Sequence, residues 1–185
     1  LVRGLGDVYK RQTDTIAIPQ VKPKMPLSIY TLATIALHQD GPSYGIFFAM
    51  MRRHGFFLHA SSDFKSIGKT EGNCDKDGNI DKANDKPYYT GKTRHSNYTL
   101  TVGAIHHICK SLRIFEGIGY GRSATAWQMG ESEGGGYLLN DGLTHKGVTG
   151  EVGILGSIGR LTLSASAITI AGKQWQGSIG IGIKL

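Results

Sequence analysis

The residues of this chain that are best suited to chemistry lie in the short alternating stretch HASSD. His59, Ser61 and Asp63 are spaced two residues apart, and in a β-strand this spacing places three side chains on one face. A histidine, a hydroxyl and a carboxylate are the groups used in acyl transfer, where the imidazole takes the proton of the nucleophilic hydroxyl. Glu151, in a later alternating stretch, is expected on the same interior face.

We interpret these residues first as a buried hydrogen-bonded network and only second as a catalytic site. The strands of this chain are expected to form a small barrel, whose lumen is just filled by side chains, and polar side chains buried there need hydrogen-bond partners. An acyl-transfer site needs an aligned nucleophile and an oxyanion donor, and the sequence reveals neither. We therefore predict no catalysis and no cofactor. If the chain were an enzyme, His59, Ser61 and Asp63 would be its catalytic residues.

A second group of candidate ligands lies in the sequence CDKDGNID. Its oxygen ligands alternate along the chain at Asp75, Asp77, Asn79 and Asp81, as in a calcium loop. The EF-hand pattern requires glycine at its sixth position and glutamate at its twelfth, where this chain has Ile80 and Lys86. Because Asp-Gly-Asn is also ordinary turn chemistry, we predict a solvated external loop without a metal.

Three potential zinc ligands, His106, His107 and Cys109, lie close together at a predicted turn. Strand alternation sends the two histidines to opposite faces, and the sequence offers no fourth ligand. The second cysteine, Cys74, is expected in an external loop at the other end of the barrel. The two thiols would then be a bilayer apart, which is beyond disulfide reach, so we predict that they are not bonded.

The elements that position these residues are β-strands, because apolar/polar alternation and not helical periodicity dominates the chain from residue 28. We expect eight strands, at about residues 29–38, 43–52, 55–64, 96–106, 112–125, 146–156, 159–169 and 174–184. Most are about 9–11 residues long, the length of a tilted strand that crosses a bilayer. Strands of soluble proteins are shorter, typically about 5–6 residues.

The alternation also predicts which face of each strand is apolar. In the last strand one face carries Trp175, Ile179, Ile181, Ile183 and Leu185, and the other carries Gln174, Gln176, Ser178, Gly180, Gly182 and Lys184. In the third strand Phe56, Leu58, Ala60 and Phe64 oppose Phe57, His59, Ser61 and Asp63. The strand at 112–125 is ambiguous, because Glu116 shares a face with Ile114 and Ile118 while three glycines occupy the other.

The connections between the expected strands alternate in length. In order along the chain they are short (39–42), tight (53–54), long (65–95), tight (107–111), long (126–145), tight (157–158) and short (170–173), so that every second connection is tight. Outer-membrane barrels have short periplasmic turns and longer external loops, and this sorting matches them. We predict an all-β fold, a closed antiparallel eight-stranded up-and-down β-barrel of the transmembrane type, with both termini at the tight-turn end.

Several stretches resemble the small outer-membrane β-barrel domains of Bacteroides-type bacteria. They are SYGIFFAMMRRHGFFLHASSDF, LRIFEGIGYGRSATAWQM, THKGVTGEVGI and the terminal GSIGIGIKL, and the resemblance covers residues 28–185. It implies a barrel of the cell envelope, which in that group is often the C-terminal domain of a longer surface protein. The chain departs from the pattern at its last residue, which is Leu185 where such barrels commonly have an aromatic residue.

The first residues of the chain differ in character from all the others. Asp7–Gln12, within LVRGLGDVYKRQ, resembles the translated end of a transposase-based sequencing adapter, so we interpret residues 1–12 as non-native. Residues 13–27 hold three of the five prolines and are expected to be a linker, and residues 28–185 are the barrel domain. On this interpretation the signal peptide and an upstream region are missing from the sequence.

Composition limits the partners. The net charge is +7, but the basic residues are scattered without a Lys/Arg run, so we predict no nucleic-acid binding. No stretch approaches the roughly 18 apolar residues of a membrane helix. We therefore predict a monomer in the bacterial outer membrane that contacts lipid, has a plugged lumen, and serves as an anchor or binds an unidentified partner through its two long loops.

Two alternatives remain open. A soluble lipocalin-like barrel that binds a small apolar ligand would also have eight strands, but its apolar face would point inward and Ser164, Gln176 and His59 outward. The His-x-Ser pair of His59 and Ser61 resembles that of the outer-membrane lipid A deacylases, which implies an enzyme.

Overall fold

The computed structural model describes residues 25–80 and 85–185. The segment at 1–12 that is predicted to be non-native, most of the predicted linker at 13–27, and the candidate calcium ligand Asp81 lie outside the described residues. Within the described ranges, the chain contains no helix of the length and apolar character needed to cross a membrane.

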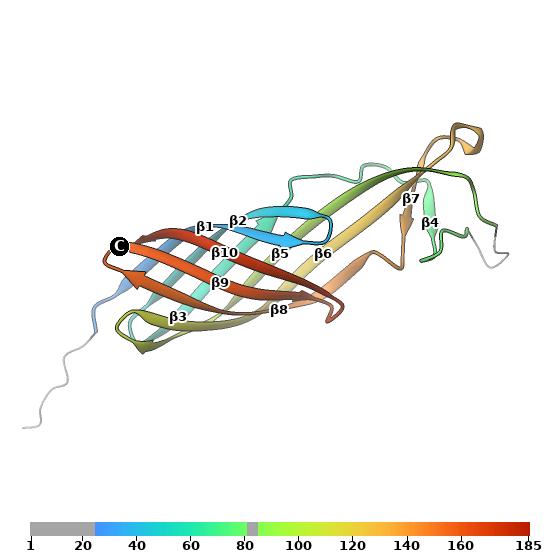
Figure 1. The fold of residues 1–185 in the computed structure, drawn as a ribbon. Helices are drawn as coiled ribbons and strands as arrows, with labels where there is room; N and C mark the ends of the chain where they lie inside the picture. Colours follow the sequence, from blue (N-terminus) through green and yellow to red (C-terminus); the bar gives the residue numbers. More distant parts are fainter. Residues whose placement is uncertain (1–24, 81–84) are drawn as a thin grey trace, which may run out of the picture.

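Eight strands form a closed antiparallel ring, as the sequence predicts. They are β1 (Ser28–His38), β2 (Gly41–Met51), β3 (His54–Ser62), β5 (Tyr89–Cys109), β6 (Leu112–Met129), β8 (His145–Ile158), β9 (Leu161–Ile170) and β10 (Gln174–Lys184). Consecutive barrel strands pair with each other, and β1 pairs with β10 from Tyr30 opposite Lys184 to Leu37 opposite Gly177 (Figure 1). Closure leaves no unpaired sheet edge, which is the condition for strands to cross a bilayer.

The two ends of the barrel differ. The tight turns at 52–53, 110–111 and 159–160 lie at one end, together with the start of β1 and the end of β10; we call it the turn end. The opposite end, here the loop end, carries the connections between β3 and β5 and between β6 and β8. This sorting of short and long connections is the one that the sequence predicts.

The two long connections are more ordered than the predicted solvated loops. β5 begins at Tyr89 and not near 96, and β6 continues to Met129 and not to 125. Two short strands, β4 (Gly72–Cys74) and β7 (Tyr137–Asn140), join them, with β7 antiparallel to β6 and β4 parallel to β7. A 3₁₀ helix, η1 (Glu131–Glu133), precedes β7. Together they form a β extension that projects from the loop end (Figure 1).

The extension has its own apolar contacts. Ile67 packs over Ala124 and Ala126 of β6, which are almost fully buried. A second cluster joins Cys74, Met129 and Leu138. The prediction of two loops was wrong at these positions because the contacts join segments far apart in sequence.

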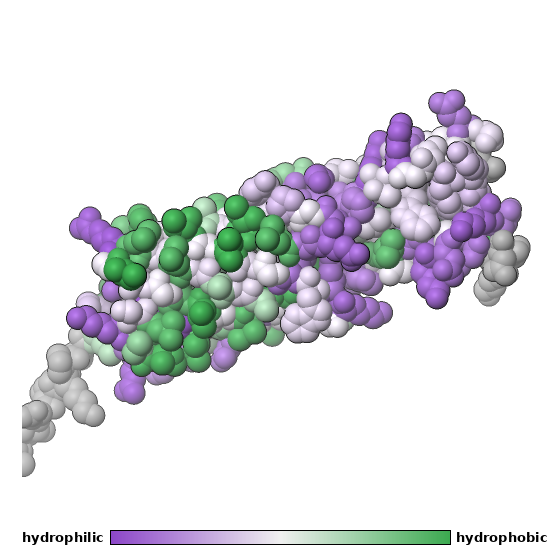
Figure 2. Space-filling view, viewed as in Figure 1, coloured by the Kyte–Doolittle hydropathy of each residue, from purple (hydrophilic) through white to green (hydrophobic). Residues whose placement is uncertain are grey.

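The outer face of the barrel is apolar. Large side chains that point outward and are 44–69% exposed include Ile46, Leu58, Leu100, Val102, Ile118, Val152, Leu163, Ile179 and Ile181. On the face in view, Figure 2 shows green side chains gathered over the barrel and purple side chains over the loop end. Exposure of so large a continuous apolar surface suits lipid and not water. His59 and Gln176 point inward instead, which argues against the soluble lipocalin-like alternative.

The interior combines an apolar half and a polar half. A buried cluster near the turn end contains Tyr30, Leu32, Phe47, Ala49, Met51, Phe57, Ile105, Phe115 and Leu155. The rings of Phe47 and Phe57 are stacked with centroids 5.2 Å apart. A Cβ on Gly153 would lie 2.4 Å from the ring of Phe115, so the inward-facing glycine provides the space for this ring.

The structure resolves the ambiguous strand β6. Gly117, Gly119 and Gly121 face the interior, whereas Glu116 faces outward with a side chain that is 63% exposed. Two aromatic residues lie away from the outward face of the barrel: Tyr30 is fully buried inside, and Trp127 packs on Tyr89 in the extension.

Candidate functional site

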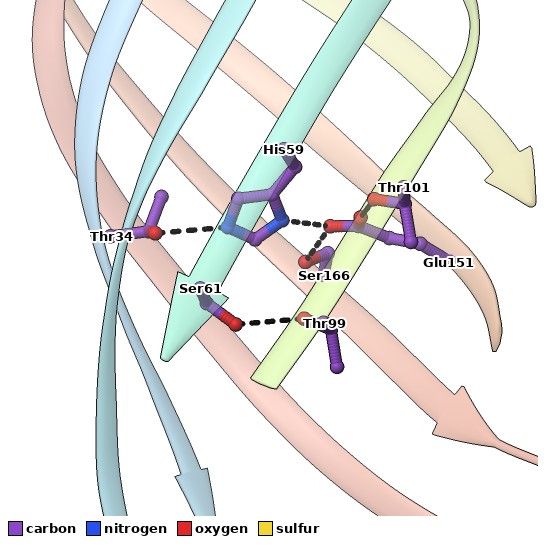
Figure 3. A network of polar contacts seen from close by, with 7 residues as sticks. All are labelled: Thr34, His59, Ser61, Thr99, Thr101, Glu151 and Ser166. Carbon is purple, nitrogen blue, oxygen red and sulfur yellow. Dashed lines mark hydrogen bonds and ion pairs between the residues drawn. The ribbon is translucent and has the colours of Figure 1, made fainter. Parts of the chain in front are cut away.

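The predicted polar residues of β3 and β8 meet inside the barrel. Nδ1 of His59 lies 2.8 Å from Oε1 of Glu151, and Nε2 of His59 lies 2.9 Å from Oγ1 of Thr34 (Figure 3). His59 is 2% exposed and Glu151 is 4% exposed. A buried pair of this kind is tolerated only when each group is fully hydrogen-bonded.

Further donors complete the partners of the Glu151 carboxylate. Ser166 donates to Oε1 over 2.9 Å, and Thr101 donates to Oε2. Gly117 of β6 is the register partner of Glu151, and Gly119 is the register partner of Thr101. These two glycines present no side chain between β8 and β5, so the carboxylate can reach across β6. The Gly-x-Gly-Tyr-Gly stretch thus provides room for the network.

Ser61 and Asp63 share the inward face with His59, as strand alternation requires, but they do not join it in a triad. The Ser61 hydroxyl is 2.8 Å from Oγ1 of Thr99. The Asp63 carboxylate accepts the backbone N–H of Lys65 at 3.0 Å. The acyl-transfer arrangement that would use Ser61 as the nucleophile of His59 is therefore not formed.

The hydroxyl that does contact the imidazole is Thr34, which the sequence reasoning did not single out. Thr34 is on β1 and His59 on β3, with β2 between them, and Gly45 of β2 is the register partner of Thr34. A Cβ on Gly45 would lie 2.6 Å from the Thr34 hydroxyl. The missing side chain at Gly45 therefore allows Thr34 to lean across β2 to His59.

The order Thr34, His59, Glu151 is that of a nucleophile, a base and an orienting carboxylate. All three groups are at most 4% exposed, and Gly45 packs directly against the hydroxyl. A substrate carbonyl would have to enter this filled interior to reach Thr34. The arrangement is suited to joining β1, β3, β5, β8 and β9 through side-chain hydrogen bonds.

The candidate calcium loop is closed by its own hydrogen bonds. Oδ1 of Asp75 accepts the backbone N–H groups of Asp77 and Asn79 at 2.8 and 2.9 Å, and Oδ2 accepts the Asn79 side-chain amide at 3.0 Å. These bonds, those from Asn79 first, hold the pKa of the Asp75 carboxyl below its ordinary value. In the described part of the chain, no group of three His, Cys, Asp or Glu side chains is arranged to hold a metal.

The residues considered for zinc are separated by the strand alternation. His106 turns toward His54 of β3, with 2.8 Å between their Nδ1 atoms, and its Nε2 lies 3.5 Å from the Glu116 carboxylate. Cys109 is exposed at the turn end, and Cys74 is buried in the extension at the other end. Both thiols are free, and burial raises the pKa of the Cys74 thiol.

A cleft that the sequence analysis missed opens at the loop end, between the barrel rim and the extension. Its volume is about 360 Å³, and it is lined by Gln39, Asp40, Thr93, His95, Thr125, Trp127, Leu143, His145, Lys173, Gln174 and Trp175. Nδ1 of His95 lies 3.1 Å from the Thr125 hydroxyl and 3.4 Å from the Asp40 carboxylate. Oε1 of Gln174 is buried without a hydrogen-bond partner among the described residues.

Comparison with solved structures identifies the same fold in two bacterial outer-membrane barrels. One is Ail, the attachment invasion locus protein of Yersinia pestis, solved with the heparin analogue sucrose octasulfate. The two structures align with a TM-score of 0.51 and a sequence identity of 11%, and the alignment covers 86% of this chain and 96% of Ail. The other is the N-terminal β-barrel domain of Pseudomonas aeruginosa OprF, with a TM-score of 0.50 at 11% identity over 85% and 97%. No protein-family model and no curated protein sequence matches the chain. The chain therefore has the fold of small outer-membrane barrels.

Proposed function

We propose that this chain is anchored in a bacterial outer membrane by its barrel and binds a ligand at its loop end, without catalysis. The outward apolar face, the closed ring and the fold shared with Ail and OprF support the anchoring. The sequence resemblance to Bacteroides-type barrel domains supports the same location. The turn end would face the periplasm and the extension the outside.

The lumen is proposed to be closed to solutes. The rings of Phe47, Phe57 and Phe115 pack together in its turn-end half, with centroids 4.9–5.2 Å apart. The network around His59 and Glu151 occupies its middle. Eight strands enclose an interior just wide enough for such side chains, so the protein is not proposed to be a porin.

The observation that supports ligand binding is the cleft at the loop end. Trp127 contributes an apolar ring, Trp175 lies at the edge of the cleft on the outward face of β10, and Asp40, His95 and Gln174 provide polar groups beside them. This combination suits a sugar, whose ring faces pack on indole rings while its hydroxyls take and give hydrogen bonds. The buried, unpartnered Oε1 of Gln174 is an acceptor available to such a hydroxyl. We therefore propose a saccharide as the ligand class.

The two tryptophans make a direct test possible, because the chain has only two and both line the cleft. The protein refolded in detergent would be titrated with sucrose, sucrose octasulfate and a panel of neutral disaccharides while indole fluorescence is recorded. We expect a saturable change with at least one sugar, and weaker binding in Trp127→Phe, Trp175→Phe and Asp40→Asn. Lys110→Gln, at the turn end, is the matched control and should bind normally.

If no sugar changes the indole fluorescence of correctly folded protein, the binding proposal is overturned and the anchoring proposal is unaffected. Folding is checked independently by the change in gel migration on boiling. Anchoring would be overturned if the protein folds in water without detergent or lipid. The absence of catalysis would be overturned by esterase activity that Thr34→Val or Ser61→Ala removes.

A further inference from the structure

A small basic pocket lies on the outer side of the loop end, away from the cleft. It has a volume of about 180 Å³ and is lined by Lys65, Ser66, Ile67, Gly68, Thr70, Ser96, Arg122 and Leu139. Two of these residues are cationic, three have hydroxyl groups, and none is acidic. Pockets for drug-sized ligands measure about 300–1,000 Å³, so this one suits a single small group with negative charge.

Arg122 is the main reason to expect an anion there. Its Nε is buried and has no hydrogen-bond partner among the described residues. Within the same ranges, neither Arg122 nor Lys65 forms an ion pair with a carboxylate. A buried donor without an acceptor costs about 1–3 kcal/mol, and more when it is charged, so an acceptor from outside the chain would relieve this cost.

The position of Arg122 along β6 sets its depth in a membrane. Ile118, Tyr120 and Arg122 follow one another on the outward face, and Tyr98 of β5 is the register partner of Arg122. Outward tyrosines are typical of the membrane interface, above the apolar band. Two residues of a strand rise about 6–7 Å, which places Arg122 beyond Tyr120 and level with Tyr98, at the membrane interface where lipid headgroups lie.

The basic character continues around the pocket. Lys146 of β8 is the register partner of Arg122 on the side away from Tyr98. Arg94 of β5 donates to the carbonyl of Ile67 at 3.1 Å and stacks over the Tyr137 ring at 3.8 Å, which fixes the segment that forms the pocket wall. One wall of the pocket is therefore the irregular segment 65–70 between β3 and β4, which these contacts hold against the extension.

We propose that this pocket binds the phosphate group of an anionic lipid in the outer leaflet. The planar Arg122 guanidinium supplies donors in the geometry that matches phosphate oxygens, Lys65 supplies a second charge, and the hydroxyls of Ser66, Thr70 and Ser96 supply neutral donors. The proposal rests on the membrane placement proposed above, and it adds a specific lipid contact to that placement.

The test uses the full chain reconstituted in phosphatidylcholine vesicles that contain one part in five phosphatidic acid. After gentle detergent extraction at about 0.15 M salt, where non-specific surface attraction is screened, the lipids that remain with the protein are quantified by mass spectrometry. We expect phosphatidic acid to be enriched several-fold over its share in the vesicles. Arg122→Gln and Lys65→Gln should each reduce it to that share, whereas Lys110→Gln at the turn end should not.

Three outcomes would decide against the proposal. The lipid site is overturned if Arg122→Gln and the parent retain equal amounts of phosphatidic acid while gel migration shows that both are inserted. This outcome does not affect the proposed membrane anchor. Release of the lipid by millimolar inorganic phosphate would identify a site for free anions and overturn the lipid as its occupant. Failure of the parent chain to insert into vesicles would overturn the anchor and the lipid site together.

Discussion

The Glu151 carboxylate is the most heavily bonded side chain of the interior, with contacts from His59, Ser166 and Thr101. Glu151→Ala would leave His59 buried without its acceptor, and breaking a buried pair in this way costs about 3–5 kcal/mol. Ser61→Ala removes only a bond between two hydroxyls, for which we expect about 1–3 kcal/mol. Urea unfolding of the reconstituted protein measures both values.

Equal losses in these two variants would contradict the assignment of Glu151 as the centre of the network. Thr34→Val is a useful third variant, because it keeps the side-chain shape and removes only the hydroxyl bonded to His59. It should resemble Ser61→Ala and not Glu151→Ala.

A different residue-scale prediction concerns pH. The hydrogen bonds of the turn lower the pKa of the Asp75 carboxyl from its ordinary value of 3.8. The ionised carboxylate therefore stabilises the turn fully at pH values above 3.8. This stabilisation is lost as the pH falls through the lowered pKa. The NMR shift of the Asn79 backbone amide should therefore titrate with a midpoint below 3.8. Asp75→Asn should remove this titration, and a midpoint in the parent at or above the ordinary value would show that the bonds do not form.

At the scale of elements, inward glycines determine how closely strands and rings pack. A Cβ on the inward Gly153 would lie 2.4 Å from the Phe115 ring, whereas a Cβ on Gly177, which is on the exposed outward face of β10, would meet nothing within 4 Å. Gly153→Ala should therefore cost about 1–3 kcal/mol through overpacking. Gly177→Ala should be neutral or stabilise by up to about 1 kcal/mol, because it restricts the unfolded chain. Equal unfolding midpoints for the two variants would show that the interior near Phe115 is loosely packed.

The elements also show what the sequence could predict. The inward direction of His59, Ser61 and Asp63 follows from alternation within one strand, which is local information. Thr34 could not be paired with His59 in advance, because their contact depends on the register of β1 against β2 and of β2 against β3. One residue of slippage would turn either side chain to the opposite face.

The extension could not be predicted for a related reason. Residues 89–95 are mostly polar and lack a clear alternation, so their local sequence indicates a loop. They become a strand because β6 continues beside them, from Thr93 opposite Trp127 to Ser96 opposite Ala124. The buried contact of Ile67 with Ala124 and Ala126 then covers the outer side of this ladder, and no local pattern in the sequence reveals that contact.

For the whole molecule, the apolar band and the polar extension define a direction across the membrane. The start of β1, the end of β10 and the tight turns lie at one end of the barrel, and the extension lies at the other. In an outer membrane the short turns face the periplasm. The loop-end cleft and the basic pocket would then both lie at the outer surface, the cleft above the lumen and the pocket at the level proposed for the lipid headgroups.

The cysteines provide a test of this direction in intact cells. Cys109 is exposed at the turn end, whereas Cys74 is buried and its pKa is raised by that burial, so it contains little of the reactive thiolate. In intact cells, a membrane-impermeant maleimide should not label the parent protein. After the outer membrane is permeabilised, it should modify Cys109. Ser132→Cys, exposed in η1 of the extension, should be labelled in intact cells, and Cys109→Ser should remove the signal that appears on permeabilisation. Labelling of Cys109 in intact cells would reverse the orientation and place the extension, the cleft and the basic pocket on the periplasmic side.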